Sequence, residues 1–134
     1  MKFKAEYYWF LIFAICFTAF NQIQDNIRPN YNGDNSVIEY LLGVAPNFFP
    51  AIGLPALVII LIQQSAKERN SNSSFYLKRH LSANLISIFG LVGWEFIQLF
   101  GKLQFDWNDI LWTFIGALLF HFIWSISPHK FKEL

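Results

Sequence analysis

The chain has 134 residues, of which 54% are hydrophobic and 14% are charged, and its formal net charge is +1. So apolar a composition excludes an ordinary soluble domain, and a charge so close to neutral gives no indication of a nucleic-acid partner. The apolar residues form blocks of membrane-spanning length. We therefore predict an all-α integral membrane bundle, a single domain over residues 1–134, with four transmembrane helices near residues 7–20, 48–62, 81–100 and 110–126.

The first predicted helix, residues 7–20, follows Lys2 and Lys4 as the apolar part of a secretory signal would. Its end offers no small-x-small cleavage site, so we expect this helix to be retained. Cys16, the single cysteine, lies inside the block. One cysteine excludes a disulfide framework and a cysteine-based metal site.

The second predicted helix, residues 48–62, is the least regular, because prolines lie in it and just before it: Pro46, Pro50 and Pro55. Proline removes a helical hydrogen bond, so we expect this helix to be kinked. Ser36 and Glu39 have the spacing of a capping box. That spacing predicts a short helix over residues 37–44, which either lies at the surface or leads into the span.

Basic residues predict the orientation in the membrane. Eight of the ten lysines and arginines lie before the first helix, between the second and third, or after the fourth; the other two are Arg28 and Lys102. Because basic residues remain on the cytoplasmic side, we expect both termini in the cytoplasm and the turn at residues 101–107 outside. Aromatic residues at the block ends suit interfacial anchoring: Tyr7, Tyr8, Trp9, Trp94, Trp107, Trp112 and Trp124.

The third and fourth predicted helices, residues 81–100 and 110–126, carry the candidate site. Glu95 lies within an apolar run, where a carboxylate is costly and usually has a function. Helical spacing puts Glu95, Gln98 and Lys102 on one stripe, and Asp109, Thr113 and Gly116 on another. The short turn makes these helices neighbours. We therefore expect an outward-facing polar pocket whose ligand-binding residues are Glu95, Gln98, Lys102, Asp106, Asp109 and Thr113.

Purely structural interpretations stand beside this one. Asp106 and Asp109 fit the N-cap and N3 positions of the fourth helix equally well, where carboxylates complement free amides and the helix dipole. Glu95 could make a buried polar contact without binding anything. His121 lies toward the cytoplasmic half and is more typical of a packing histidine than of a proton relay.

The polar residues in the last third of the chain follow a recognisable order. A Glu-x-x-Gln helix end precedes a short turn with glycine, a Phe-Asp-x-x-Asp segment and a helical glycine: Glu95, Gln98, Leu99, Phe100, Phe105, Asp106, Asp109 and Gly116. This order resembles the signature of the VanZ-like family of small bacterial membrane proteins. That family carries an arginine in the turn and an asparagine in the next helix, where this sequence has Gln104 and Thr113. Lys102 is then the cation expected near the carboxylates.

The resemblance implies a multi-pass protein of the bacterial cytoplasmic membrane, linked to the cell envelope and to glycopeptide resistance of the teicoplanin type. The residues themselves predict an acidic, outward-facing pocket that could bind a lipid headgroup. Together with the resemblance, the expected partner is a membrane lipid or a lipid-linked envelope precursor. A cationic or metal-bridged headgroup suits three nearby carboxylates as well as a bare anion does. No catalytic residue, metal ligand or cofactor is assigned.

Two further interpretations remain open. Paired carboxylates can perform acid–base chemistry, so the alternative function is a small intramembrane enzyme that acts on a lipid headgroup through Glu95 or Asp109. Small residues on the third and fourth helices would also permit a homo-oligomer through close helix contact: Gly90, Gly93, Gly116 and Ala117.

Overall fold

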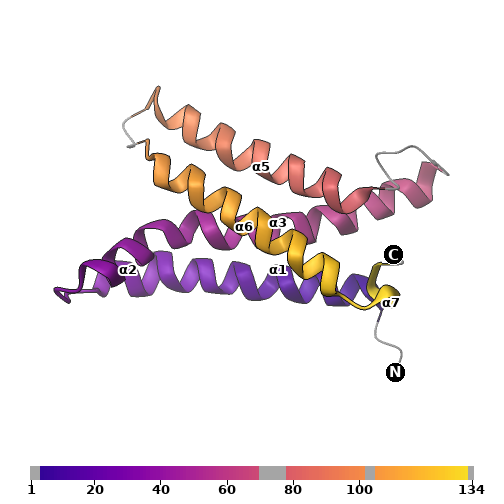
Figure 1. Ribbon diagram of the computed structural model, residues 1–134, viewed down its shortest axis with the longest axis horizontal. Coiled ribbons are helices and arrows are strands. Elements are labelled where there is room, and N and C mark those ends of the chain that lie inside the picture. Colours follow the sequence, from indigo (N-terminus) through magenta and orange to yellow (C-terminus); the bar gives the residue numbers. More distant parts are fainter. Residues whose placement is uncertain (1–3, 70–77, 102–104, 133–134) are drawn as a thin grey trace.

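The computed structural model describes residues 4–69, 78–101 and 105–132, and it is helical wherever it has regular structure (Figure 1). The elements are α1 (Ala5–Asn21), the π-helix η1 (Gln22–Ile27), α2 (Arg28–Asn30), α3 (Ser36–Arg69), α5 (Arg79–Gln98), α6 (Trp107–Ile126) and α7 (His129–Lys132). The prediction of an all-α chain is confirmed for the described residues.

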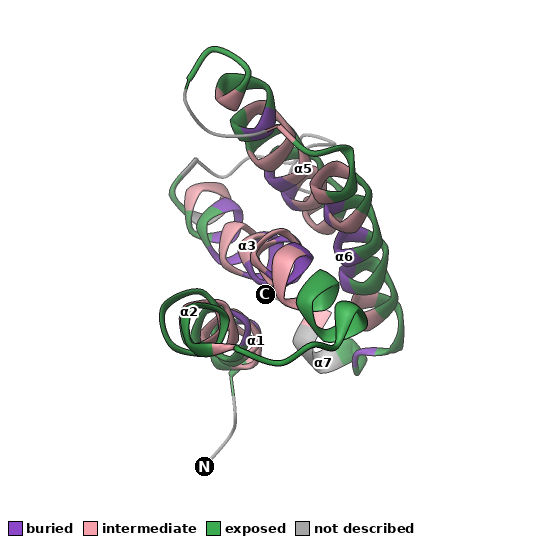
Figure 2. Ribbon diagram, turned by 90° about the vertical axis from the view of Figure 1, so that its left-hand side faces the viewer, coloured by how far each residue is buried: buried purple, intermediate pink, exposed green. Residues whose placement is uncertain are grey.

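Helix α3 occupies the centre of the bundle. It contacts α1 on one side and both α5 and α6 on the other, and α5 also contacts α6 (Figure 2). Half of the residues in the most apolar stretch of α3 are buried, compared with 17% for α5 and 28% for α6. The outer helices therefore leave most of their apolar side chains on the surface, where lipid can cover them.

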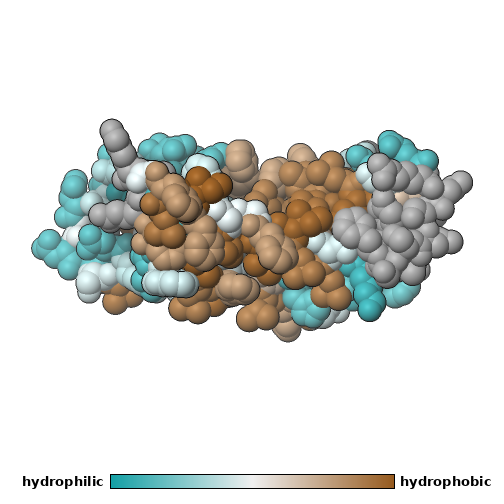
Figure 3. Space-filling view, turned by 90° about the horizontal axis from the view of Figure 1, so that it is seen from above, coloured by the Kyte–Doolittle hydropathy of each residue, from teal (hydrophilic) through white to brown (hydrophobic). Residues whose placement is uncertain are grey.

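Three helices are long and apolar enough to cross a membrane: Ser36–Ala66 within α3, Arg79–Gln98 and Trp107–Ile126. Figure 3 shows apolar side chains across the middle of the long axis and hydrophilic ones toward both ends, as expected for a multi-pass membrane protein. Helix α1 has 17 residues, or about 26 Å, slightly less than a bilayer core. The helical backbone continues through the more polar η1 and α2. A fourth crossing therefore stays a prediction.

Helix α3 begins earlier and runs further than the sequence predicted. Residues 37–44 are helical and lead directly into the predicted span, because one helix of 34 residues contains this segment and all three prolines. The alternative of a short helix lying at the surface is wrong. The cap of α3 also differs: the Oδ1 atom of Asn35 accepts hydrogen bonds from the backbone N–H groups of Val37 and Ile38, at 3.0 and 3.3 Å. Packing against three helices outweighs a cost of about 3 kcal/mol for each interior proline. The kink itself remains a prediction.

Two glycines permit the close packing around α3. A Cβ atom added to Gly116 of α6 would lie 2.7 Å from the backbone oxygen of Phe48, and one added to Gly53 would lie 2.8 Å from the Cβ atom of Cys16 in α1. By contrast, nothing lies within 4 Å of a Cβ atom added to Gly90 or Gly93. Gly116 thus serves helix packing within the chain, whereas Gly90 and Gly93 have space for contact with a helix of another copy of the chain.

Aromatic packing joins the start of α1 to the end of α6. Trp9 is completely buried, and its ring lies 5.0 Å from that of Trp124 and 6.0 Å from that of Phe120. Trp9 is therefore a core residue, which corrects its interpretation as an interfacial anchor. Trp94 and Trp107 remain exposed, as that interpretation requires.

Candidate ligand-binding cavity

A cavity of about 760 Å³ lies near the end of the bundle where α5 ends and α6 begins. Side chains from α1, η1, α2, α3, α5 and α6 line it. Its polar lining comprises Gln24, Arg28, Asn47, Glu95, Gln98 and Asp109. Its other lining residues are Phe20, Gly43, Pro46, Pro50, Leu91 and Trp94. Gln24, Arg28 and Trp94 are exposed, so the cavity reaches the molecular surface.

Glu95 is the most enclosed of the charged residues in the cavity wall. Its side chain is 2% exposed, and one carboxylate oxygen, Oε2, has no hydrogen-bond partner among the described residues. The side chain of Gln98, one turn later on α5, lies close enough to the same carboxyl group to interact with it. Residues three apart share a helix face, which explains why this pair meets. One oxygen of this carboxyl group is therefore buried in the cavity wall without a donor from the described residues.

Asp109 brings a second carboxyl group to the cavity from the first turn of α6. The side chain of Asn47 on α3 lies close enough to interact with it, and Arg28 is close enough to attract it electrostatically. Asp109 also interacts electrostatically with Glu95. The lining thus holds two carboxyl groups and one guanidinium group. When both carboxyl groups are ionised, the cavity is net negative.

Adjoining this polar cavity is an apolar groove of about 180 Å³ between α1 and α3. Its wall consists of Phe13, Cys16, Phe17, Phe20, Pro50, Gly53 and Leu54. Phe20 and Pro50 line both spaces. A molecule with a polar end and an apolar end could therefore occupy the two spaces at once.

The structure brings together Glu95, Gln98 and Asp109, three of the six residues predicted to bind a ligand. Asp106 instead caps α6, because its Oδ1 atom accepts a hydrogen bond of 2.8 Å from the backbone N–H of Asn108. The capping interpretation is confirmed for Asp106. Asp109, for which capping was the alternative interpretation, lines the cavity and lies near Asn47.

The remaining two predicted residues lie elsewhere. Thr113 is fully buried and donates its hydroxyl hydrogen to the backbone oxygen of Asp109 at 2.8 Å, so its polarity is satisfied within α6 and it is not part of the cavity wall. Lys102, the cation expected near the carboxylates, lies outside the described residues. Its proposed role stays a prediction.

Sequence reasoning missed Arg28, Asn47 and Gln24, which come from the first half of the chain. Arg28 was considered only as evidence of orientation, yet it is a cation in the cavity wall. Asn47 carried a usable signal, because it is a lone amide in an otherwise apolar segment between Pro46 and Pro50. The argument that singled out Glu95 applies to such a residue as well.

His121 lies on α6 away from this cavity. Its side chain is exposed, and its ring stacks on that of His80 with 5.7 Å between ring centres. His80 in turn stacks on Trp124, with 4.7 Å between ring centres. These contacts fit the packing role that the sequence favoured for His121, although the residue is not buried.

Comparison with known proteins gives no match: no family model, curated protein or solved structure is significantly similar to this chain. Evidence about function therefore comes from the geometry of the cavity and from the sequence itself.

Proposed function

We propose that this chain is a non-catalytic VanZ-like protein of the bacterial cytoplasmic membrane that binds an amphiphilic or lipid-linked envelope ligand. The observation that carries the proposal is the polar cavity around Glu95 and its junction with the apolar groove at Phe20 and Pro50. The ligand's headgroup contacts Glu95, Gln98 and Asp109, and its apolar part lies in the groove between α1 and α3.

The dimensions and chemistry of the cavity support this proposal. Ligand sites usually enclose about 300–1,000 Å³ and combine apolar walls with a few polar groups. The cavity, at about 760 Å³, falls within that range and has such a lining. A buried carboxylate destabilises a membrane protein unless a partner compensates for its lost hydration. A ligand that donates to Glu95 would provide that compensation.

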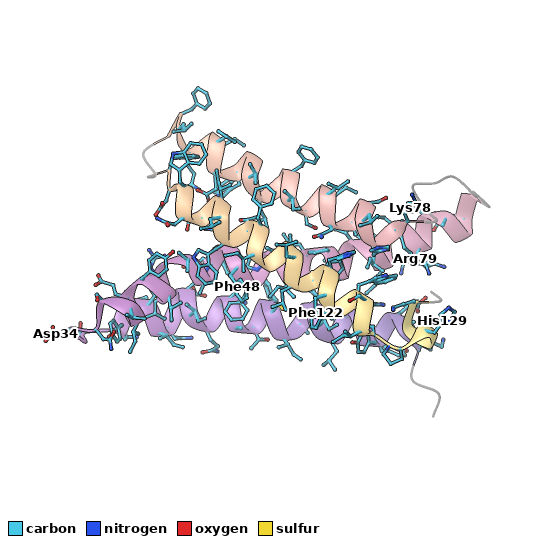
Figure 4. All side chains as sticks on the ribbon, in the orientation of Figure 1. Asp34, Phe48, Lys78, Arg79, Phe122 and His129 are labelled. Carbon is cyan, nitrogen blue, oxygen red and sulfur yellow. The ribbon has the colours of Figure 1, made fainter. Side chains whose placement is uncertain are left out.

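The arrangement of the helices supports an outward-facing site. The described chain begins and ends at one end of the bundle, where α3 also ends and α5 begins (Figure 1). Lys78, Arg79 and His129 lie at that end, whereas Asp34 lies at the opposite one (Figure 4). With four crossings and the basic end in the cytoplasm, the cavity faces the outer leaflet. There it could meet envelope precursors, which agrees with the resistance link that the resemblance implies.

Two matched glycine variants test whether the cavity holds an amphiphile. Neither Gly43 nor Gly90 has any atom within 4 Å of an added Cβ, but only Gly43 lines the cavity. We expect Gly43→Phe to fill the cavity and to remove tightly bound lipid from the purified protein, whereas Gly90→Phe retains it. Mass spectrometry after detergent washing measures lipid bound per chain. At matched membrane abundance, Gly43→Phe should also lower any teicoplanin resistance conferred by the protein.

Equal amounts of tightly bound lipid in the two variants would contradict the proposal. Both substitutions introduce the same side chain into a long helix, so a general effect of phenylalanine on folding would appear in both. Circular dichroism of each purified variant establishes that the helical content is retained.

A further inference from the structure

We propose that the ligand's headgroup carries a primary ammonium group next to an anionic group, as phosphoethanolamine does. The ammonium contacts the carboxyl groups of Glu95 and Asp109, and the anionic group contacts Arg28. This inference rests on the proposed function, because it specifies which headgroup enters the cavity lined by these residues.

The buried oxygen of Glu95 calls for a hydrogen-bond donor. An ionised carboxylate can only accept hydrogen bonds. Its Oε2 atom has no partner among the described residues, although the side chain is only 2% exposed. Leaving such an acceptor unsatisfied destabilises the folded protein, and more so when the group is charged. A primary ammonium offers three donors and a positive charge, so it satisfies this oxygen and also has donors for Asp109.

The second carboxyl group argues against an anion deep in the cavity. Asp109 and Glu95 already repel one another electrostatically when both are ionised, and Asp106 adds to the negative field at Glu95. Two like charges a few ångströms apart repel strongly in a partly buried site, because little water screens them. A phosphate between the carboxyl groups would meet such repulsion from each, whereas an ammonium would meet attraction.

Arg28 supplies the complementary charge at the exposed part of the same wall. Its guanidinium group donates a 3.4 Å hydrogen bond to the neutral side chain of Gln24 and attracts Asp109. A guanidinium group holds phosphate well because its donors form a planar fork. Glu95 is buried and Arg28 exposed. The order of charges therefore places a terminal ammonium inside and the adjoining phosphate nearer the opening, with an acyl chain in the groove beside Phe20.

The experiment compares two soluble lipids that differ in the amine. Dioctanoyl phosphatidylethanolamine and dioctanoyl phosphatidylglycerol are titrated into the full-length purified protein in detergent, and binding is followed by native mass spectrometry. We expect the ethanolamine lipid to bind about tenfold more tightly, the effect of one charge-assisted hydrogen bond. Glu95→Gln should weaken that lipid by about tenfold and abolish the preference. The control Glu68→Gln, on an exposed residue at the other end of α3, should leave it unchanged.

Two more variants separate recognition of the amine from recognition of the phosphate. Arg28→Gln should weaken both lipids, because both carry a phosphate, while Lys78→Gln at the opposite end should weaken neither. Asp109→Asn provides a second test of the amine site if Glu95→Gln does not fold. Free phosphoethanolamine, added as a competitor of the ethanolamine lipid, distinguishes the sources of the headgroup. If it displaces the lipid at similar concentrations, the headgroup is sufficient for binding. If it does not, the acyl chains are required.

Equal or tighter binding of phosphatidylglycerol would overturn this inference, as would a preference that survives Glu95→Gln. If phosphatidylglycerol binds and Gly43→Phe displaces it, amphiphile binding stands and only the amine specificity fails. If neither lipid binds and Gly43→Phe changes nothing, the proposed function fails as well.

Discussion

Two aspartates in one turn have different roles because their side chains leave the helix in different directions. Asp106 precedes α6 in an extended backbone conformation, with φ −130° and ψ 125°, so its carboxylate folds back onto the amide of Asn108. Asp109 lies within the helix, and its side chain meets Asn47 of α3 instead. The first residue stabilises the helix, and the second takes part in the cavity.

This difference predicts opposite sensitivities to substitution. Asp106→Ala removes the cap and should lower the stability of the protein by about 0.5–2 kcal/mol, whereas Asp106→Asn keeps an oxygen acceptor and should cost much less. Lipid binding should persist in both, because Asp106 does not line the cavity. Thermal unfolding in detergent, followed by circular dichroism, measures the stability. If the alanine and asparagine variants unfold together, the cap contributes nothing.

The sequence could identify half of the polar residues that line the cavity, three of six, for a physical reason. Glu95, Gln98 and Asp109 come from two adjacent helices joined by a short turn, so helical spacing alone predicts that they meet. Asn47 reaches the cavity because α3 packs at the centre of the bundle, and Arg28 reaches it because α2, which precedes α3, packs beside it. That placement depends on packing between distant segments, which no local pattern encodes.

At the scale of whole elements, α3 is held helical by packing against its neighbours although its prolines disfavour a helix. The predicted boundaries of the three other long helices agree with α1, α5 and α6 to within three residues, because each is an uninterrupted apolar block. The second block contains prolines, which disfavour helix locally. Contacts with α1, α5 and α6 nevertheless hold it as one helix from Ser36 to Arg69.

The close approach of α3 and α6 predicts a sharp contrast between two glycines. Gly116→Ala places a Cβ atom 2.7 Å from the backbone oxygen of Phe48, so the helices must separate. We expect a loss of stability of about 1–3 kcal/mol, typical of overpacking. Gly90→Ala has free space and should be neutral or stabilise the helix by up to about 1 kcal/mol. Unfolding in increasing denaturant compares them, and equal stabilities would contradict the tight contact.

At the scale of the whole molecule, the two ends of the bundle differ in charge and in function. Tyr8 and Ser127 share a hydrogen bond of 2.9 Å between α1 and the segment after α6, and Arg79 of α5 donates to the backbone oxygen of Lys132. These contacts join the start and end of the described chain to the basic end of the bundle. The cavity lies toward the other end, with Asp34 (Figure 4). Such asymmetry suits a protein whose two ends face different compartments.

The side of the membrane reached by each end decides whether α1 is a fourth crossing. Single cysteines replace Lys4, Asp34 or Lys78 on a Cys16→Ala background, and an impermeant maleimide is added to intact cells. We expect Asp34→Cys to be labelled from outside and Lys78→Cys only after lysis, because basic residues remain inside. If η1 extends α1 across the bilayer, Lys4→Cys behaves like Lys78→Cys. Labelling of Lys4→Cys together with Asp34→Cys from outside would mean three crossings, with α1 lying against α3 without traversing the membrane.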